Sequence, residues 1–341
     1  AQDRYGNPVG QTVSWAVSGP ATLSGSTVTA TGYGTIKVQA SIHDSVADTL
    51  TIGVVPRGTV AGLTTIDHND EIIGFNLDGS HGTGFAFLSP GGTTHWAPNG
   101  ASIVFDQGPL DIPQQIASVT PSGQVSILVD ATGGTATGPL VASPIYSRDG
   151  SVIYYADYRV ANSLWRVHPD GSGDSAVTMQ VPEPVWSPSP SPDGTQIAYI
   201  ATNYYGPSGT VKVLDVATGA ATSLGVQATW ISWSPNSDVI AYITPTYVLG
   251  LIHASGAGNT SLSTGVSGPF EWSPDGQWLI VNGPRVVNAT TGAIIPVFYY
   301  SQSVQFGVTQ QYEVFSPTWA PTPPTLQRVR PSQNRNIHIT R

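Results

Sequence analysis

The polar residues best placed to do chemistry in this 341-residue chain are carboxylates and amides at one position of a recurring turn. Oxygen atoms of this kind could ligate a metal ion. A metal site needs ligands that converge, whereas a residue that returns once per repeat is spread around the structure. We therefore expect these side chains to cap their own turns. They are Asn99, Asp149, Asp193, Asn236 and Asp275.

Other catalytic or ligand-binding patterns are weak. The seven histidines never fall in pairs at ligand spacing, and the densest polar cluster, His68 with Asp67, Asp70 and Glu71, is interpreted as a solvated loop. We find no Gly-x-Ser-x-Gly nucleophile elbow and no Gly-rich phosphate loop. The chain contains no cysteine, so it offers neither a disulfide nor a thiolate metal site. The sequence predicts a protein that is not an enzyme and holds no cofactor or metal.

The composition predicts an all-β protein. Apolar residues make up 40% of the chain and charged residues only 10%, together with 38 glycines and 28 prolines. This mixture is too apolar for a disordered chain and too rich in turn-forming residues for a helical one. No long stretch shows apolar residues at the three-to-four spacing of a helix.

The charge distribution argues against nucleic acid as a partner. The formal net charge is −9, so a phosphate-binding surface is not expected. Residues 331–341 form a basic tail, which we interpret as a solvated terminus, although it could also reach an acidic partner. No apolar run is long enough to span a membrane.

One turn motif recurs six times. Each copy ends a strand, turns through Ser-Pro-Asp-Gly or a close variant, and leaves through an apolar run, because Pro fixes φ, Asp bonds the downstream backbone and Gly tolerates positive φ. The copies lie 50, 44, 43, 39 and 47 residues apart, which is typical of four-stranded propeller blades. Their leading positions are Trp96, Tyr146, Pro190, Trp233, Trp272 and Trp319.

A second series, in which a strand runs into a Gly turn, alternates with the first. The first repeat in the chain belongs to this Gly-turn series, and the last one belongs to the Ser-Pro-Asp-Gly series. We therefore predict a six-bladed propeller at residues 62–330 whose last blade is closed by strands from both ends, near residues 72–77, 85–88 and 326–329. Tryptophans in or near the repeat register, including Trp186, are expected to pack in the core.

These repeats resemble the TolB-type propeller family, whose blades carry a Trp-Ser-Pro-Asp-Gly signature. The resemblance covers about residues 62–324 and implies the propeller fold. It implies little about function, since this fold hosts receptors, scaffolds, hydrolase lids and lyases. TolB has an α/β domain directly ahead of its propeller, whereas a different unit is expected at that place here, so TolB's role in the envelope Tol system does not carry over.

Residues 1–56 show short alternating strands, and 57–61 are expected to be a linker. This first unit resembles the bacterial immunoglobulin-like domains of the invasin and intimin type. The family's first strand is missing ahead of Ala1; we expect it, and an export signal or lipid anchor, to lie upstream, the alternative being an open edge for another chain's strand. Trp15 is expected in the core. The matching residues are 3–9, 13–15, 28–30 and 47–52.

The remaining candidates are surface residues. Long inter-strand segments rich in Tyr, Asn, Gln and Ser have a composition suited to recognition. We predict an exported bacterial scaffold, periplasmic or on the cell surface, that is an accessory subunit bound to other envelope or membrane proteins. The alternative is a glycan-binding protein or a metal-assisted polysaccharide lyase that uses the propeller channel. The candidate partner contacts are Tyr204, Tyr205, Phe298, Tyr299, Tyr300, Trp165 and Trp230.

Overall fold

The chain is all-β, as predicted. Among the residues that the computed structural model describes there are many strands and no helix. No helix within these ranges could cross a membrane. The described ranges are 13–25, 27–42, 45–56, 58–66, 69–77, 83–88, 90–108, 113–132, 140–159, 163–202, 208–283, 285–296, 301–303, 309–311, 315–321 and 326–328.

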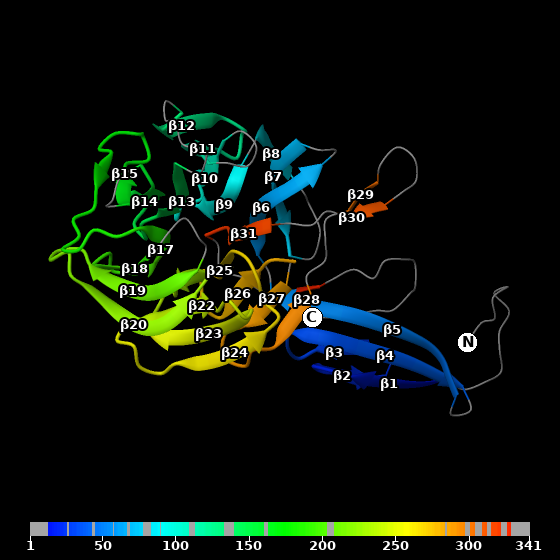
Figure 1. Ribbon diagram of the computed structural model, residues 1–341. Coiled ribbons are helices and arrows are strands. Elements are labelled where there is room, and N and C mark those ends of the chain that lie inside the picture. The colour runs from blue at the N-terminus through cyan, green and yellow to red at the C-terminus, as the bar shows by residue number, and fades with distance from the viewer. Residues whose placement is uncertain are drawn as a thin grey trace.

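Most strands belong to four-stranded antiparallel sheets arranged as in a β-propeller (Figure 1). Within five of these sheets the strands follow one another in chain order from the centre outward. The first two sheets are β9 (Pro90–Trp96), β10 (Ile103–Gln107), β11 (Gln115–Val119) and β12 (Val125–Asp130), then β13 (Val141–Tyr146), β14 (Ile153–Asp157), β15 (Leu164–Val167) and β16 (Ser175–Ala176).

The next three sheets repeat this order. Their strands are β17 (Val185–Pro190), β18 (Gln196–Ala201), β19 (Gly209–Asp215) and β20 (Ala221–Ala228); β21 (Trp230–Trp233), β22 (Val239–Ile243), β23 (Val248–His253) and β24 (Thr260–Thr264); and β25 (Phe270–Trp272), β26 (Trp278–Val281), β27 (Arg285–Asn288) and β28 (Ile294–Pro296). A separate hairpin is formed by β29 (Ser301–Ser303) and β30 (Thr309–Gln311).

Strands from both ends of the chain share one further sheet. Its order is β31 (Phe315–Trp319), β6 (Thr59–Ile66), β7 (Asn69–Asn76) and β8 (Thr83–Leu88). The inner strands then form a closed ring, because β9, β13, β17, β21, β25 and β31 each contact the next and β31 contacts β9. The predicted closure by strands from both chain ends is confirmed.

The prediction for residues 326–329 is wrong. The sheet that holds β31 already has four strands, so β32 (Leu326–Arg328) pairs instead with residues 54–56 of β5. It thereby becomes the edge strand of the N-terminal sheet. That sheet has the order β1 (Ser14–Ser18), β4 (Gly34–Ile42), β5 (Ser45–Pro56) and β32, with the hairpin β2 (Ala21–Ser24) and β3 (Thr27–Ala30) beside it.

Trp15 was expected in the core, and it is 46% exposed. Strand alternation places it on the same face of β1 as Val17, whose partner across β4 is Val38. Val17 packs against the core of the N-terminal sheet, which also includes residues of the β2–β3 hairpin, but Trp15 is not part of that cluster. The described second layer is this two-stranded hairpin, and it leaves Trp15 uncovered.

The N-terminal sheet and the ring share a hydrophobic cluster. Val55 at the end of β5 is fully buried with Trp278 and Trp319 of the ring. The Tyr33 ring packs edge-on against Trp278, with ring centroids 4.9 Å apart. The linker predicted at residues 57–61 is shorter than expected, because residues 59–61 belong to β6 and only two residues separate β5 from β6. A side chain at Gly58 would clash with the Trp319 ring. The two parts therefore pack directly against each other.

Candidate functional site: the axial cup

The recurring turns are built as the sequence predicted. In the turn after β25, Gly276 N donates to Ser273 O at 2.8 Å, and Gly276 has a φ of 69°. The Asp275 carboxylate accepts from Ser273 Oγ at 2.6 Å and from Gln277 N at 3.0 Å. Asn99, Asp149 and Asp193 accept from the backbone of their own turns in the same way, which confirms the prediction for these residues. Asn236 differs, because its Nδ2 donates to Pro274 O of the next turn at 3.4 Å.

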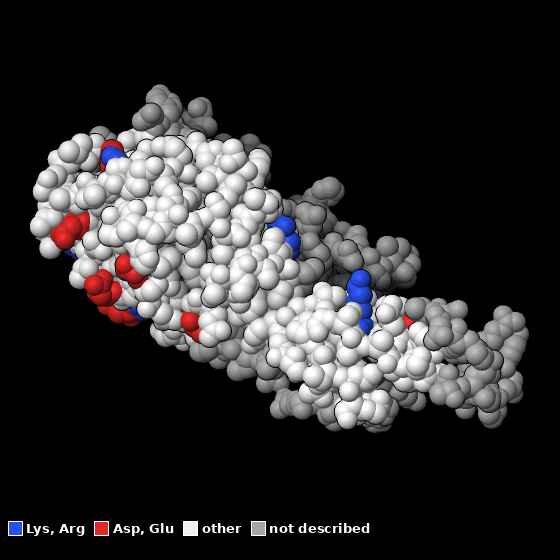
Figure 2. All heavy atoms as spheres, turned by 90° about the horizontal axis from the view of Figure 1, so that it is seen from below, with Lys and Arg blue, Asp and Glu red and all other residues white. Residues whose placement is uncertain are grey.

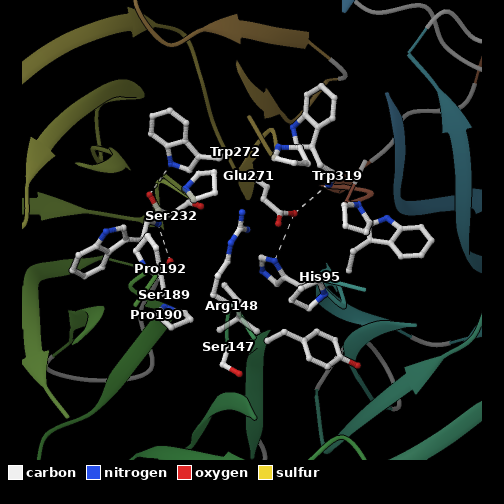
Figure 3. A pocket seen from close by; sticks show the side chains of 18 of the residues that line it. His95, Ser147, Arg148, Ser189, Pro190, Pro192, Ser232, Glu271, Trp272 and Trp319 are labelled. Carbon is white, nitrogen blue, oxygen red and sulfur yellow. Dashed lines mark hydrogen bonds and ion pairs between the residues drawn. The ribbon is translucent and has the colours of Figure 1, made fainter. Parts of the chain in front are cut away.

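A cavity of about 300 Å³ lies where the turns surround the axis of the ring, and we call it the axial cup. Figure 3 shows its lining side chains converging from several sheets. Repeat geometry explains the lining. The residue two places after each leading position lines the cup, as does the residue before five of the six leading positions, so equivalent residues of successive sheets meet there.

The residue two places after the leading position is proline in five copies and arginine in one. Pro98, Pro192, Pro235, Pro274 and Pro321 all line the cup. Arg148 occupies the equivalent place after β13 and also lines it. In Figure 3 its long side chain extends into the centre of the cup.

The residue before the leading position varies from copy to copy, and in two copies it is titratable. His95 stands there on β9 and Glu271 on β25. Glu271 Oε2 accepts a hydrogen bond from Trp319 N at 3.3 Å and lies 3.7 Å from His95 Nδ1. Both side chains are about one-fifth exposed. The Glu271 carboxylate, which belongs to β25, is thus held at the rim by Trp319 of β31 and lies close to His95 of β9.

Arg148 differs from the other cationic side chains of the ring. Arg159 pairs with Asp157 at 2.6 Å, and Lys212 pairs with Glu183 at 2.7 Å. Arg166 and Arg285 donate hydrogen bonds to Ser175 Oγ and to backbone carbonyl oxygens respectively. Among the described lysines and arginines of the ring, Arg148 alone makes no hydrogen bond or ion pair with another described residue, and its side chain is exposed.

Acidic residues outnumber lysines and arginines in the chain, 21 to 12. Figure 2 shows one face of the molecule, on which most side chains are uncharged and acidic side chains gather toward one end. Around the cup, Asp149, Asp193 and Asp275 directly follow residues of the lining. Hydrogen bonds from Ser147 and Ser191 respectively are the largest cause that lowers the pKa of Asp149 and Asp193. These carboxylates accept hydrogen bonds within their own turns, and they also place negative charge near Arg148.

Below His95 and Ile145 the channel narrows to a cavity of about 20 Å³. Its polar side includes Thr93 and Ser143, and the Ser143 backbone has a φ of 55° within a bulge of β13. Buried Asp106 joins the two, because it accepts from Thr93 N at 3.1 Å, Thr93 Oγ1 at 2.9 Å and Ser143 N at 2.9 Å. This network holds two neighbouring sheets together at the axis.

Burial raises the pKa of Asp106 in the folded protein, and the hydrogen bonds only partly oppose this. The folded protein then binds the proton more tightly than the unfolded chain does. The contribution of Asp106 to stability is therefore fully present below the ordinary Asp pKa and falls as the pH rises toward the raised value. Asp106→Asn should remove this fall and cost about 1–3 kcal/mol, since one buried N–H loses its acceptor. Urea unfolding at a series of pH values measures both the pH dependence of the unfolding free energy and the loss of stability in the variant.

Asp193→Asn is the matched control. The pKa of Asp193 is lowered by its turn hydrogen bonds, so its contribution to stability is present above the ordinary Asp pKa and is lost as the pH falls. The two variants should therefore change the pH dependence of stability in opposite directions. The same direction of change in both would contradict the role given to Asp106.

No protein-family model matches the chain, and neither does any curated protein. Solved structures do match. TolB from Acinetobacter baumannii has a TM-score of 0.60 at 13% identity, over 93% of this chain and 84% of that one. The fold is similar to TolB-type β-propellers. A putative TolB from Agrobacterium tumefaciens has a TM-score of 0.54 at 12% identity, over 80% of this chain and 98% of that one.

A chain in the nidogen/laminin complex is also similar, with a TM-score of 0.57 at 9% identity, over 77% of this chain and 98% of that one. At these identities the comparisons show the TolB-type propeller fold and nothing about activity. Within the described residues, no group of three or more His, Cys, Asp or Glu side chains could hold a metal ion.

Of the sequence-predicted contact residues, the structure describes Trp165 and Trp230, and neither lines the cup. Tyr204, Tyr205 and the run 298–300 fall outside the described residues. Trp165 on β15 is half-buried against the cluster formed by two neighbouring sheets. Trp230 on β21 is half-buried, lines the narrow part of the channel and packs against Trp186 at 5.4 Å between ring centroids. Their role as partner contacts stays a prediction.

Sequence reasoning missed the three charged or titratable residues of the cup. Arg148 was visible as a substitution inside an otherwise proline-containing motif, and His95 and Glu271 each precede a leading tryptophan. Aligning the six copies would have found Arg148, because its position is proline in the other five, but not His95 and Glu271, whose position varies among the copies. Such a break is informative because repeat packing alone gives no reason for it.

Proposed function

We propose that this chain is a non-enzymatic exported scaffold protein of the bacterial envelope that docks on another protein through its axial cup. In this proposal the TolB-type fold is a six-bladed propeller, the N-terminal part is an immunoglobulin-like module, and the whole is an accessory subunit on the periplasmic side of a larger membrane complex. The fold similarity supports the architecture, and the cup supports the binding role.

The observation that carries the proposal is Arg148. A proline at this place would fit the turn as it does in the five other copies. The arginine instead puts an exposed cation on the axis, where no described residue forms a hydrogen bond or ion pair with it. A conformationally free cation contributes little to folding. It is well suited to binding a ligand from outside.

The hydroxyl and carboxylate groups of the cup favour binding over catalysis. Ser189 Oγ accepts from Trp233 N at 2.8 Å, and Ser147 Oγ donates to Asp149 at 2.7 Å. Both serines therefore serve the fold. Glu271 is held by the Trp319 backbone. A catalytic serine would instead need a hydroxyl that lies within hydrogen-bond reach of a general base and is not used by the fold.

The alternative of glycan binding or a metal-assisted lyase reaction in the channel has no comparable support. His95 and Glu271 are close, but they are two groups, and a metal site of this kind needs at least three protein ligands. The aromatic residues of the cup, such as Trp272, are largely buried and present little ring face to a sugar.

Site-specific photo-crosslinking tests the proposal. A photoreactive amino acid at Pro192, in the cup, should capture a partner protein in the native cells. The matched control is Ile127 on β12, which is 46% exposed and lies on the outermost strand of its sheet. A crosslink at Pro192 that disappears with Arg148→Gln supports the proposal. Crosslinks only at Ile127, or none at either place, would overturn it.

A further inference from the structure

We propose that the axial cup recognises a free C-terminal carboxylate at the end of a partner protein chain. This inference rests on the proposed function and names the chemical group that the cup binds. It follows from three properties of the cup, which are its cation, its neighbouring acceptor and its closed floor.

The cation is the first property. Arg148 carries a planar guanidinium with five N–H donors, a geometry that matches a carboxylate through two parallel hydrogen bonds. Glu271 lines the cup, and the acidic residues Asp149, Asp193 and Asp275 each come directly after a lining residue in the sequence. A ligand with several negative charges, such as a phosphate chain, would be repelled by these groups. A single carboxylate fits one arginine in acidic surroundings.

The acceptor is the second property. Only Oε2 of Glu271 is engaged by the described residues, through Trp319 N and His95, so its other oxygen can accept a hydrogen bond from a ligand. A chain end offers both groups in a fixed relation, since the amide N–H of the last residue lies next to its carboxylate. The carboxylate would pair with Arg148 and the amide would donate to Glu271.

The closed floor is the third property. The cup holds about 300 Å³, at the lower limit of typical ligand pockets and room for one or two residues. Beyond His95 and Ile145 the space falls to about 20 Å³. A space of that size holds about one water molecule and has no room for a peptide backbone, which favours a chain end over an internal segment. The proline walls of the cup provide apolar contacts for the last side chain.

Two peptide pools test this inference. One pool contains acetylated Gly-Ala-Ala-Xaa tetrapeptides with every amino acid at Xaa and a free carboxylate, and the other contains the same peptides as carboxamides. Binding to the full chain is measured by saturation-transfer NMR up to about 1 mM. The carboxylate pool should bind at least about tenfold more tightly than the carboxamide pool, as expected for loss of a charge-assisted bidentate contact.

The variants locate the effect. Arg148→Gln should abolish the preference for the carboxylate pool, whereas Arg166→Gln, which removes an exposed cation on β15, should leave it intact. Equal binding of both pools, retention of the preference by Arg148→Gln, or no binding of either pool would overturn the inference. The proposed function would survive that result if the Pro192 crosslink still depends on Arg148, and would fail with it if that crosslink is absent.

Discussion

Trp272→Ala is expected to lower the free energy of unfolding by about 3–5 kcal/mol, the cost of emptying a large buried site. Trp272 is 6% exposed and packs in a cluster shared by the sheets of β22 and β26. Its Nε1 donates to Ser232 O at 2.9 Å, a bond between neighbouring inner strands of the ring. The variant therefore loses both apolar packing and a contact between sheets. Urea denaturation followed by far-UV circular dichroism measures the change.

Trp15→Ala provides the control for this prediction. Trp15 is half exposed and does not join the hydrophobic cluster of its sheet, so its removal should cost about 1 kcal/mol or less. A large loss from Trp15→Ala would mean that this side chain is covered, as the sequence had predicted. A small loss from Trp272→Ala would contradict its place at the contact between sheets.

Gly292→Ala is expected to destabilise the protein by about 3 kcal/mol or more, from backbone strain and overpacking together. Gly292 has a φ of 70°, and a Cβ atom there would overlap the carbonyl oxygen of Leu262 on the outer strand of the preceding sheet. That oxygen belongs to the backbone and cannot move without shifting β24. The second repeat series therefore needs glycine at this turn for close packing as well as for its φ.

Gly256→Ala separates these two causes. Gly256 occupies the equivalent turn one repeat earlier, with a φ of 85°, but a Cβ atom there would meet nothing within 4 Å. Its replacement should cost only the backbone strain, about 1–2 kcal/mol. Thermal unfolding of the two variants side by side gives the comparison, and equal losses would show that the contact with Leu262 is unimportant.

The fold could be predicted because its signals are local. Each turn of the Trp272 type contains the residues that its own backbone needs, and the spacing of the copies repeats the size of one sheet. The mispredictions concern tertiary context. The exposure of Trp15 depends on how much of its sheet the β2–β3 hairpin covers, and the partner of β32 depends on which sheet edge is free. Neither the exposure of Trp15 nor the partner of β32 can be predicted from the residues next to it in sequence.

The candidate site was harder to predict, because it exists only once the ring is closed. His95, Arg148 and Glu271 are separated by 53 and 123 residues in sequence and meet at the axis only in the folded chain. His95 and Glu271 also stand at a position of the repeat that varies among the copies, so only Arg148 departs from a pattern. The sequence instead favoured aromatic residues such as Tyr204 as contacts, because the long segments that hold them have a composition suited to recognition.

Affinity purification from detergent-solubilised native membranes, with the wild-type chain and Arg148→Pro in parallel, tests the docking role of the cup most directly. The variant restores the residue found in the five other copies, so the fold should be kept, which an unchanged unfolding temperature would verify. We predict a stoichiometric partner protein with the wild type and its loss with the variant. Equal recovery of the partner with both chains, or a lone wild-type chain that retains a divalent metal or an oligosaccharide, would contradict the account.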